Sequence, residues 1–145
     1  MSASATVTEV VVDCSVVMAW YFADEKCDYA DAILDGLTSS MQIVVPTLWS
    51  LEVANVLVCA ERRGRSTPSQ AAAWLPLLEA LPILVDSQTG VRAWSDTLDL
   101  ARLHGLSVYD AAYLELASRR GIPLATLDRK LIGVSPNAGV ALFTP

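Results

Sequence analysis

Short apolar runs alternate along this chain with longer segments in which apolar residues recur at helical spacing. The short runs predict strands at residues 7–12, 42–45, 83–85, 123–127 and 140–143. The longer segments predict helices at residues 16–22, 28–37, 46–63, 89–104, 107–118 and 129–132, and one more that begins at Thr67. This alternation implies an α/β sandwich with a mainly parallel sheet.

The start of the helix at Thr67 has a clear sequence signature. Thr67 is suited to the N-cap, Pro68 to the first helical position, and Gln70 to the closing position of a capping box. Pro76 is expected to kink or split this helix after Leu75, because proline removes a backbone donor.

Asp110 lies in the first turn of a helix that is otherwise strongly apolar. A carboxylate on a buried helix is costly unless something pairs with it, and Arg119 and Arg120 come more than two turns later. One explanation is local, because Ser107 and Asp110 have the spacing of a capping box and an acid suits the positive end of a helix. The other explanation requires partners elsewhere in the chain.

Three further acids fall where they could meet Asp110. Asp13 follows the first predicted strand and Asp128 follows the strand at 123–127, and sites in parallel α/β sheets form at the carboxyl ends of strands. Glu52 lies early in the apolar helix at 46–63. Each has a local alternative, since Asp13 and Asp128 could be N-caps and Glu52 could favour a helix start.

A cluster of carboxylates without cations is unfavourable, and a hard divalent cation such as Mg²⁺ resolves the repulsion with oxygen ligands and waters. Near a phosphodiester, such a cation activates water and neutralises the scissile phosphate. Ser15 and Thr126, each two positions from an acid, could hydrogen-bond these carboxylates, although local capping is the alternative. Asn55 shares a helix face with Glu52 and could orient it.

Length and composition are those of one globular domain, assigned to residues 1–145 with residues 1–6 as a flexible N-terminus. The hydrophobic fraction of 53% is high and suggests a subunit interface, yet no apolar run reaches the roughly 20 residues of a membrane helix. No secretory signal is visible, and the three cysteines have no CxxC spacing. These features predict a reduced, cytoplasmic setting.

The net charge of −6 argues against a nucleic-acid partner, unless several of the acids hold metal ions. The chain has a single histidine, His104, and this excludes a nuclease that uses a pair of histidines as acid and base. The sequence also has no G-x-S-x-G turn, P-loop, G-x-G-x-x-G or zinc-spaced Cys/His set. Its basic residues are clustered, either as solvated helix ends or as local patches.

Four segments in this order resemble the PIN-domain nucleases, and among them the VapC toxins of bacterial and archaeal toxin–antitoxin modules. They are Val-Val-Asp13-Cys-Ser15, Leu51-Glu52-Val-Ala-Asn55-Val-Leu, Tyr109-Asp110-Ala-Ala-Tyr and Thr126-Leu-Asp128-Arg-Lys-Leu. The likeness extends from about residue 10 to residue 143, and the four motifs are specific only as a set.

The resemblance implies a PIN-like three-layer α/β/α sandwich and an endoribonuclease that uses Mg²⁺ or Mn²⁺. Asp13, Glu52, Asp110 and Asp128 would form its acidic site, supported by Thr126, Ser15 and Asn55. It also implies a homodimer and an antitoxin whose C-terminal segment covers the site. RNA binding would then be left to local basic patches, formed by Arg62, Arg63, Arg65, Arg129 and Lys130.

Two alternatives to a toxin remain open from the sequence. One is a PIN nuclease that acts in RNA processing or on DNA structures, and the short chain favours the toxin over it. The other is a PIN-like interaction module without catalysis, for which the loss of one of the four acids would have been a sign. All four acids are present.

Overall fold

A parallel four-stranded sheet forms the centre of the computed structural model, which describes residues 8–145. Residues 1–6, assigned above to a flexible N-terminus, and Val7, the first residue of the first predicted strand, lie outside the described residues. The strand order is β3-β2-β1-β4, and every pairing is parallel. The strands are β1 (Glu9–Val12), β2 (Gln42–Pro46), β3 (Ile83–Asp86) and β4 (Leu124–Ala125).

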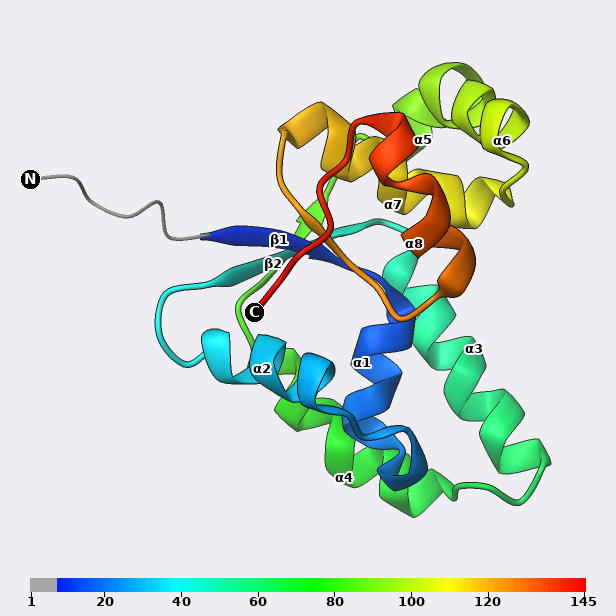
Figure 1. Cartoon of the computed structure of the whole chain (residues 1–145). Helices are drawn as coiled ribbons and strands as arrows, with labels where there is room; N and C mark the ends of the chain where they lie inside the picture. Colours follow the sequence, from blue (N-terminus) through cyan, green and yellow to red (C-terminus); the bar gives the residue numbers. More distant parts are fainter. Residues whose placement is uncertain (1–7) are drawn as a thin grey trace, which may run out of the picture.

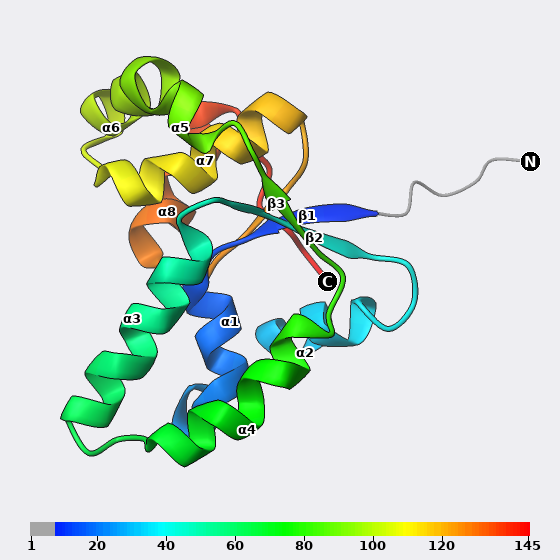
Figure 2. The ribbon, with the colours of Figure 1, turned by 180° about the vertical axis from the view of Figure 1, so that it is seen from behind.

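Helices cover both faces of this sheet, which gives the predicted three-layer α/β/α sandwich. The α-helices are α1 (Cys14–Tyr21), α2 (Asp28–Gly36), α3 (Trp49–Arg62), α4 (Pro68–Glu79), α5 (Thr89–Arg92), α6 (Leu98–His104), α7 (Val108–Arg120) and α8 (Arg129–Val134). In both ribbon views α1, α2 and α4 lie on one side of the sheet and α5, α6 and α7 on the other (Figures 1 and 2). The ends of β1 and β2 lead toward α1 and α3 (Figure 1).

Two elements position the functional end of the molecule. In β1, Val10, Val11 and Val12 are completely buried, because helices cover both faces of this central strand. Helix α7 packs across one face of the sheet against β1, β2 and β4, and its residues from Ala111 to Ala117 are all buried. The N-terminus of α7, where Asp110 lies, is thereby fixed relative to the strand ends.

The structure differs from the predictions at two helices near prolines. Pro76 does not split α4, which runs unbroken to Glu79, because a capping box at Thr67 and burial of Leu78 hold the helix on both sides. The helix predicted from residue 46 begins at Trp49. Pro46 instead pairs with Asp86 as the last residue of β2, and Thr47 and Leu48 form a turn before the helix.

Two further predictions assumed more regular secondary structure than the structure shows. The helix expected at 89–104 contains a π-helical segment, Ala93–Thr97, between α5 and α6. The final strand expected at 140–143 is reduced to a single parallel bridge between Leu124 and Leu142. Its neighbour β4 is only two residues long, since the chain beyond Ala125 leaves the sheet, so little backbone is available for pairing.

No helix within residues 8–145 is long and apolar enough to cross a membrane.

Candidate active site

Asp13 lies directly after β1 with its carboxylate buried among hydroxyl groups. Its Oδ1 accepts the backbone N–H of Ser15 at 3.1 Å and the Ser15 hydroxyl, and its Oδ2 accepts the Thr126 hydroxyl at 2.7 Å. Burial raises the pKa of Asp13, against the lowering effect of the hydroxyl groups of Ser15 and Thr126. Asp13 is therefore the N-cap of α1, as its local alternative predicted, but capping does not neutralise its charge.

The two hydroxyl groups also join the end of β1 to the segment after β4. The Ser15 hydroxyl accepts the N–H of Leu127 at 2.9 Å, and the Thr126 hydroxyl accepts the N–H of Asp128 at 3.0 Å. The predicted support of acids by Ser15 and Thr126 is thus present as hydrogen bonds. Asp128 itself caps α8, since its Oδ1 accepts the N–H groups of Lys130 at 2.9 Å and Leu131 at 3.1 Å.

Glu52 and Asp110 approach this edge from α3 and α7. Burial raises the pKa of Glu52, and the charges of Asp110 and Asp13 raise it further. Burial also raises the pKa of Asp110, with the charge of Asp128 as the second cause. Glu52 therefore lies near enough to Asp110 and Asp13, and Asp110 near enough to Asp128, for their charges to interact.

The capping box expected at Asp110 is made only in part. The N–H of Asp110 donates to the Ser107 hydroxyl at 3.1 Å, so Ser107 is the N-cap of α7. The reciprocal bond, from the Ser107 N–H to the Asp110 carboxylate, is absent from the hydrogen bonds of residues 8–145. Helix capping therefore gives the Asp110 carboxylate no hydrogen bond from the Ser107 N–H and does not explain why an acid stands at this position.

None of these four acids forms an ion pair within the part of the chain that the structure describes. Two buried acids outside this set, Asp86 and Glu115, do have a cationic partner. Arg119 on α7 pairs with Asp86 at 2.7 Å and with Glu115 at 2.8 Å, and lowers the pKa of Asp86. Arg119 thus neutralises Asp86, at the end of β3, and Glu115, on α7, whereas the four predicted acids have no cationic partner within residues 8–145.

The donor set at this edge fits a hard divalent cation, because it consists of carboxylate and hydroxyl oxygens. Over residues 8–145, no three His, Cys, Asp or Glu side chains stand close enough to hold an ion on their own. Mg²⁺ does not need such a cage, since it keeps several waters and takes only one or two carboxylates. Asp13, Glu52, Asp110 and Asp128 are the groups that could hold it.

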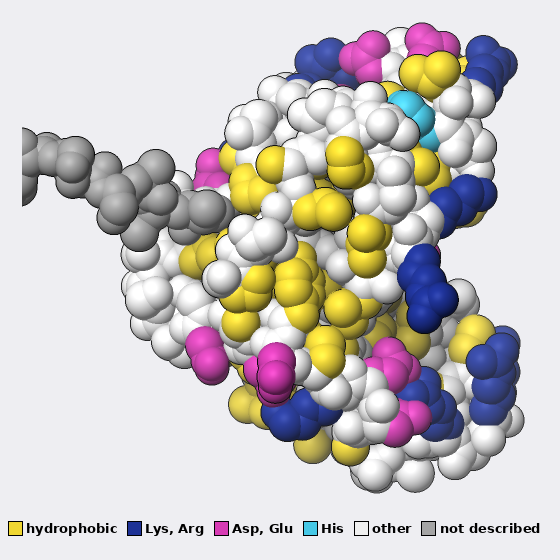
Figure 3. Space-filling view, viewed as in Figure 1, with side chains coloured by type: hydrophobic (Ala, Val, Ile, Leu, Met, Phe, Trp, Pro, Cys, Tyr) yellow, Lys and Arg dark blue, Asp and Glu magenta, His cyan; other side chains and the backbone are white. Residues whose placement is uncertain are grey.

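The predicted basic patches are only partly available for an RNA chain. Arg65 pairs with Asp24 and Glu25, both at 2.7 Å, and its guanidinium lies over the Phe22 ring. The other four are exposed and form no ion pair within residues 8–145: Arg62, Arg63, Arg129 and Lys130. Lys and Arg side chains border the indentation on the side of the molecule where the strands end (Figure 3).

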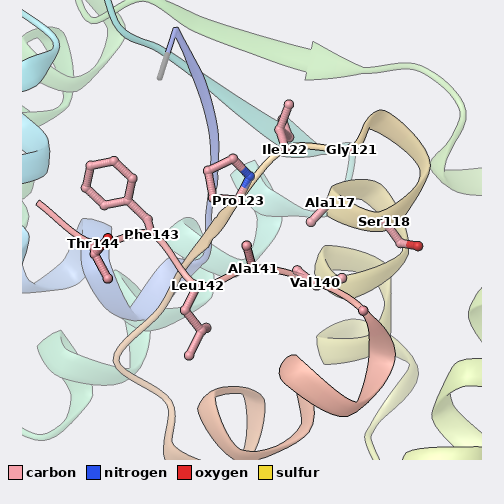
Figure 4. A pocket seen from close by; sticks show the side chains of 11 residues that line it. Ala117, Ser118, Gly121, Ile122, Pro123, Val140, Ala141, Leu142, Phe143 and Thr144 are labelled. Atoms are coloured by element: carbon pink, nitrogen blue, oxygen red, sulfur yellow. The ribbon is translucent and has the colours of Figure 1, made fainter. Parts of the chain in front are cut away.

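A separate pocket of about 350 Å³ lies between the end of α7 and the C-terminal segment. Its lining consists mainly of apolar side chains such as Ile122, Pro123, Leu142 and Phe143 (Figure 4). No carboxylate lines it, so it takes no part in the acidic site.

Comparison with known proteins agrees with this architecture. The model of the PIN domain family matches residues 10–135. The chain belongs to the PIN domain family. It is 33% identical over 137 residues to ribonuclease VapC3 of Pyrobaculum aerophilum, and the match covers 94% of this chain and 99% of that protein.

Solved structures extend the comparison of this PIN domain. PAE2754 from Pyrobaculum aerophilum has a TM-score of 0.63 and 26% identity, over 89% of this chain and 81% of that chain. FitAcB from Neisseria gonorrhoeae has a TM-score of 0.61 and 17% sequence identity, over 94% of this chain and 97% of that chain. VapBC2 from Rickettsia felis, bound to a promoter DNA fragment, has a TM-score of 0.62 and 15% sequence identity, over 94% of this chain and 98% of that chain. The last two likenesses show the fold alone.

One contact in this candidate site was missed from the sequence, and one predicted role is not seen. The hydroxyl of Tyr113, on α7, donates to Oε1 of Glu52. Asn55, expected to orient Glu52, is exposed, and its side-chain oxygen lies 4.0 Å from the Cys59 sulfur instead. The signal for Tyr113 was its position three residues after Asp110, which places both on one helix face.

Proposed function

We propose that this PIN domain is a metal-dependent endoribonuclease toxin that hydrolyses RNA phosphodiester bonds with Mg²⁺ or Mn²⁺. The observation that carries the proposal is the contrast between two sets of acids in the same fold. Asp86 and Glu115 are neutralised by Arg119, whereas none of the four predicted acids forms an ion pair within residues 8–145. The similarity to a protein named as a ribonuclease supports RNA as the substrate class.

Each part of the site has a separate task in this proposal. Asp13, Glu52, Asp110 and Asp128 hold the divalent cation, which when bound supplies water activation and neutralises the scissile phosphate. Ser15 and Thr126 hold Asp13 and the backbone of Asp128 in place through the hydrogen bonds described above.

The RNA backbone is bound by the exposed basic residues Arg62, Arg63, Arg129 and Lys130. Because this binding neutralises phosphates locally, it is compatible with a net charge of −6 for the whole chain.

Cleavage of a total-RNA pool by the purified, antitoxin-free protein tests the proposal. Discrete fragments are expected with Mg²⁺ or Mn²⁺ and none with EDTA. Asp110→Asn should abolish cleavage, and Asp99→Asn, which changes an exposed acid on α6, should leave it intact. Equal cleavage by wild type and Asp110→Asn, or cleavage that persists in EDTA, would contradict the proposal.

The proposal includes an antitoxin partner and a homodimer. Apolar side chains are exposed next to two of the acids, with Leu51 75% exposed beside Glu52 and Tyr109 64% exposed beside Asp110. Exposed apolar residues around a polar site are typical of protein interfaces.

Co-expression with a neighbouring gene for a small DNA-binding protein should give a stable complex that no longer cleaves RNA. Light scattering of the free protein should give twice the monomer mass.

A further inference from the structure

Tyr113 joins α3 and α7, the two helices that carry Glu52 and Asp110. Its side chain is among the largest that are fully buried, with 1% of it exposed. It lies one helical turn after Asp110 on α7, and its hydroxyl donates to Oε1 of Glu52 on α3, a residue 61 positions earlier in the chain. One buried side chain thus connects the supports of two acids.

Glu52 depends on this contact for its orientation. Its side chain is half-buried, and among residues 8–145 the Tyr113 hydroxyl is the hydrogen-bond partner of its carboxylate. Asp13, in contrast, is held by two hydroxyls and a backbone N–H. A glutamate has three rotatable side-chain bonds, so a single fixed partner decides where its second oxygen points.

We propose that Tyr113 is a positioning residue, whose hydroxyl holds the Glu52 carboxylate toward Asp110 and Asp13 so that it can receive a divalent cation. This inference rests on the proposed metal-dependent function. The competing explanation is that Tyr113 only satisfies its own buried hydroxyl and stabilises the fold.

The two explanations differ in what Tyr113→Phe does to metal binding. Phenylalanine keeps the ring and its packing and removes only the donor. Loss of an outer-shell partner typically costs about 10–100-fold in metal affinity. We therefore expect a drop of at least about 10-fold in Mn²⁺ affinity by titration calorimetry in a protein that still unfolds cooperatively. Tyr109→Phe is the matched control, since Tyr109 is exposed and should leave the affinity unchanged.

A double-mutant cycle separates positioning from stability. In the Glu52→Gln background, Tyr113→Phe should change Mn²⁺ affinity by less than about twofold, because its effect acts through the missing carboxylate. A structural role predicts the same loss in both backgrounds. If Tyr113→Phe does not fold, Glu52→Asp takes its place, because the shorter acid keeps its charge but cannot reach the hydroxyl. It should lose affinity about 10-fold or more.

The outcomes are distinct. Wild-type affinity in Tyr113→Phe, or in Glu52→Asp where that variant replaces it, would overturn the positioning role and leave the proposed function standing. Equal losses in both backgrounds of the cycle would also overturn it. Failure of the wild-type protein itself to bind Mn²⁺ would overturn the proposed function together with this inference.

Discussion

Asp13→Asn and Asp86→Asn are the same chemical change at the ends of two strands, and they should have different consequences. Asp86 is paired with Arg119, whereas Asp13 has no cationic partner within residues 8–145. If Asp13 serves a metal, its charge is useful only when the metal is present. If it serves the fold, its charge should matter in the metal-free protein.

The expected cost of Asp13→Asn in metal-free protein is small. An asparagine oxygen can still accept from the Ser15 N–H, but its NH₂ group would face the Thr126 hydroxyl, which now donates to Asp13 at 2.7 Å. The loss of that bond costs about 1 kcal/mol. Removal of an unpaired buried charge acts in the opposite direction, because burial disfavours the charged form of Asp13. We expect a net change in unfolding free energy of no more than about 1 kcal/mol.

Asp86→Asn should cost more. It removes the charge that accepts two hydrogen bonds from Arg119, at 2.7 and 3.2 Å. Hydrogen bonds to charged groups contribute about 1.5–3 kcal/mol, and Arg119 keeps Glu115 as its remaining partner. For a chain of this size, the loss corresponds to a fall in Tm of roughly 5–9 °C.

Thermal unfolding followed by circular dichroism measures both effects, first in EDTA and then with saturating Mn²⁺. The wild type and Asp86→Asn should gain similar stability from Mn²⁺, because ligand binding stabilises the folded state. Asp13→Asn should gain little. The reasoning is refuted if Asp13→Asn loses as much stability as Asp86→Asn in EDTA and keeps the full gain from Mn²⁺.

Three further predictions follow from the same contacts. Burial raises the pKa of Asp13, Glu52 and Asp110, so each binds a proton more tightly when folded, and the Tm of metal-free protein should fall as pH rises through these pKa values. Saturating Mn²⁺ should remove this fall in Tm. A Tm that does not change with pH in EDTA would contradict the prediction. Thr126→Val should reduce RNA cleavage at least about 10-fold, because it removes the hydroxyl that holds Asp13 and the Asp128 backbone; unchanged turnover would deny Thr126 this role. Arg63→Ala should weaken RNA binding more at low salt than at high salt, whereas Arg65→Ala should mainly lower Tm through its lost contacts with Asp24, Glu25 and Phe22. Equal RNA affinity of Arg63→Ala and wild type at every salt concentration would remove that patch from the interface.

The sequence was informative where chemistry is local. Valine-rich runs located β1 and β2, and the residues that follow such strands, such as Asp13, could be assigned to the carboxyl edge. Caps were equally readable, since Thr67 and Ser107 accept the predicted backbone bonds. These features depend on residues only a few positions apart.

Contacts between distant elements could not be predicted. Tyr113 reaches Glu52 across 61 positions, and this depends on how α7 and α3 are placed by the sheet. The basic cluster that contains Arg119 could be read as a solvated helix end or as a local patch, yet Arg119 pairs with Asp86, 33 positions earlier in the chain. The pairing of Pro46 with Asp86 likewise depends on the register between β2 and β3, and the residues around Pro46 do not indicate that register.

Anomalous scattering from a crystal soaked in Mn²⁺ tests the central claim most directly, because it locates the ion without assuming an activity. The account predicts a peak in contact with carboxylates of the set Asp13, Glu52, Asp110 and Asp128, and its loss in Asp13→Asn. A fully occupied ion bound elsewhere, or no peak at this edge at a Mn²⁺ concentration that supports cleavage, would contradict it.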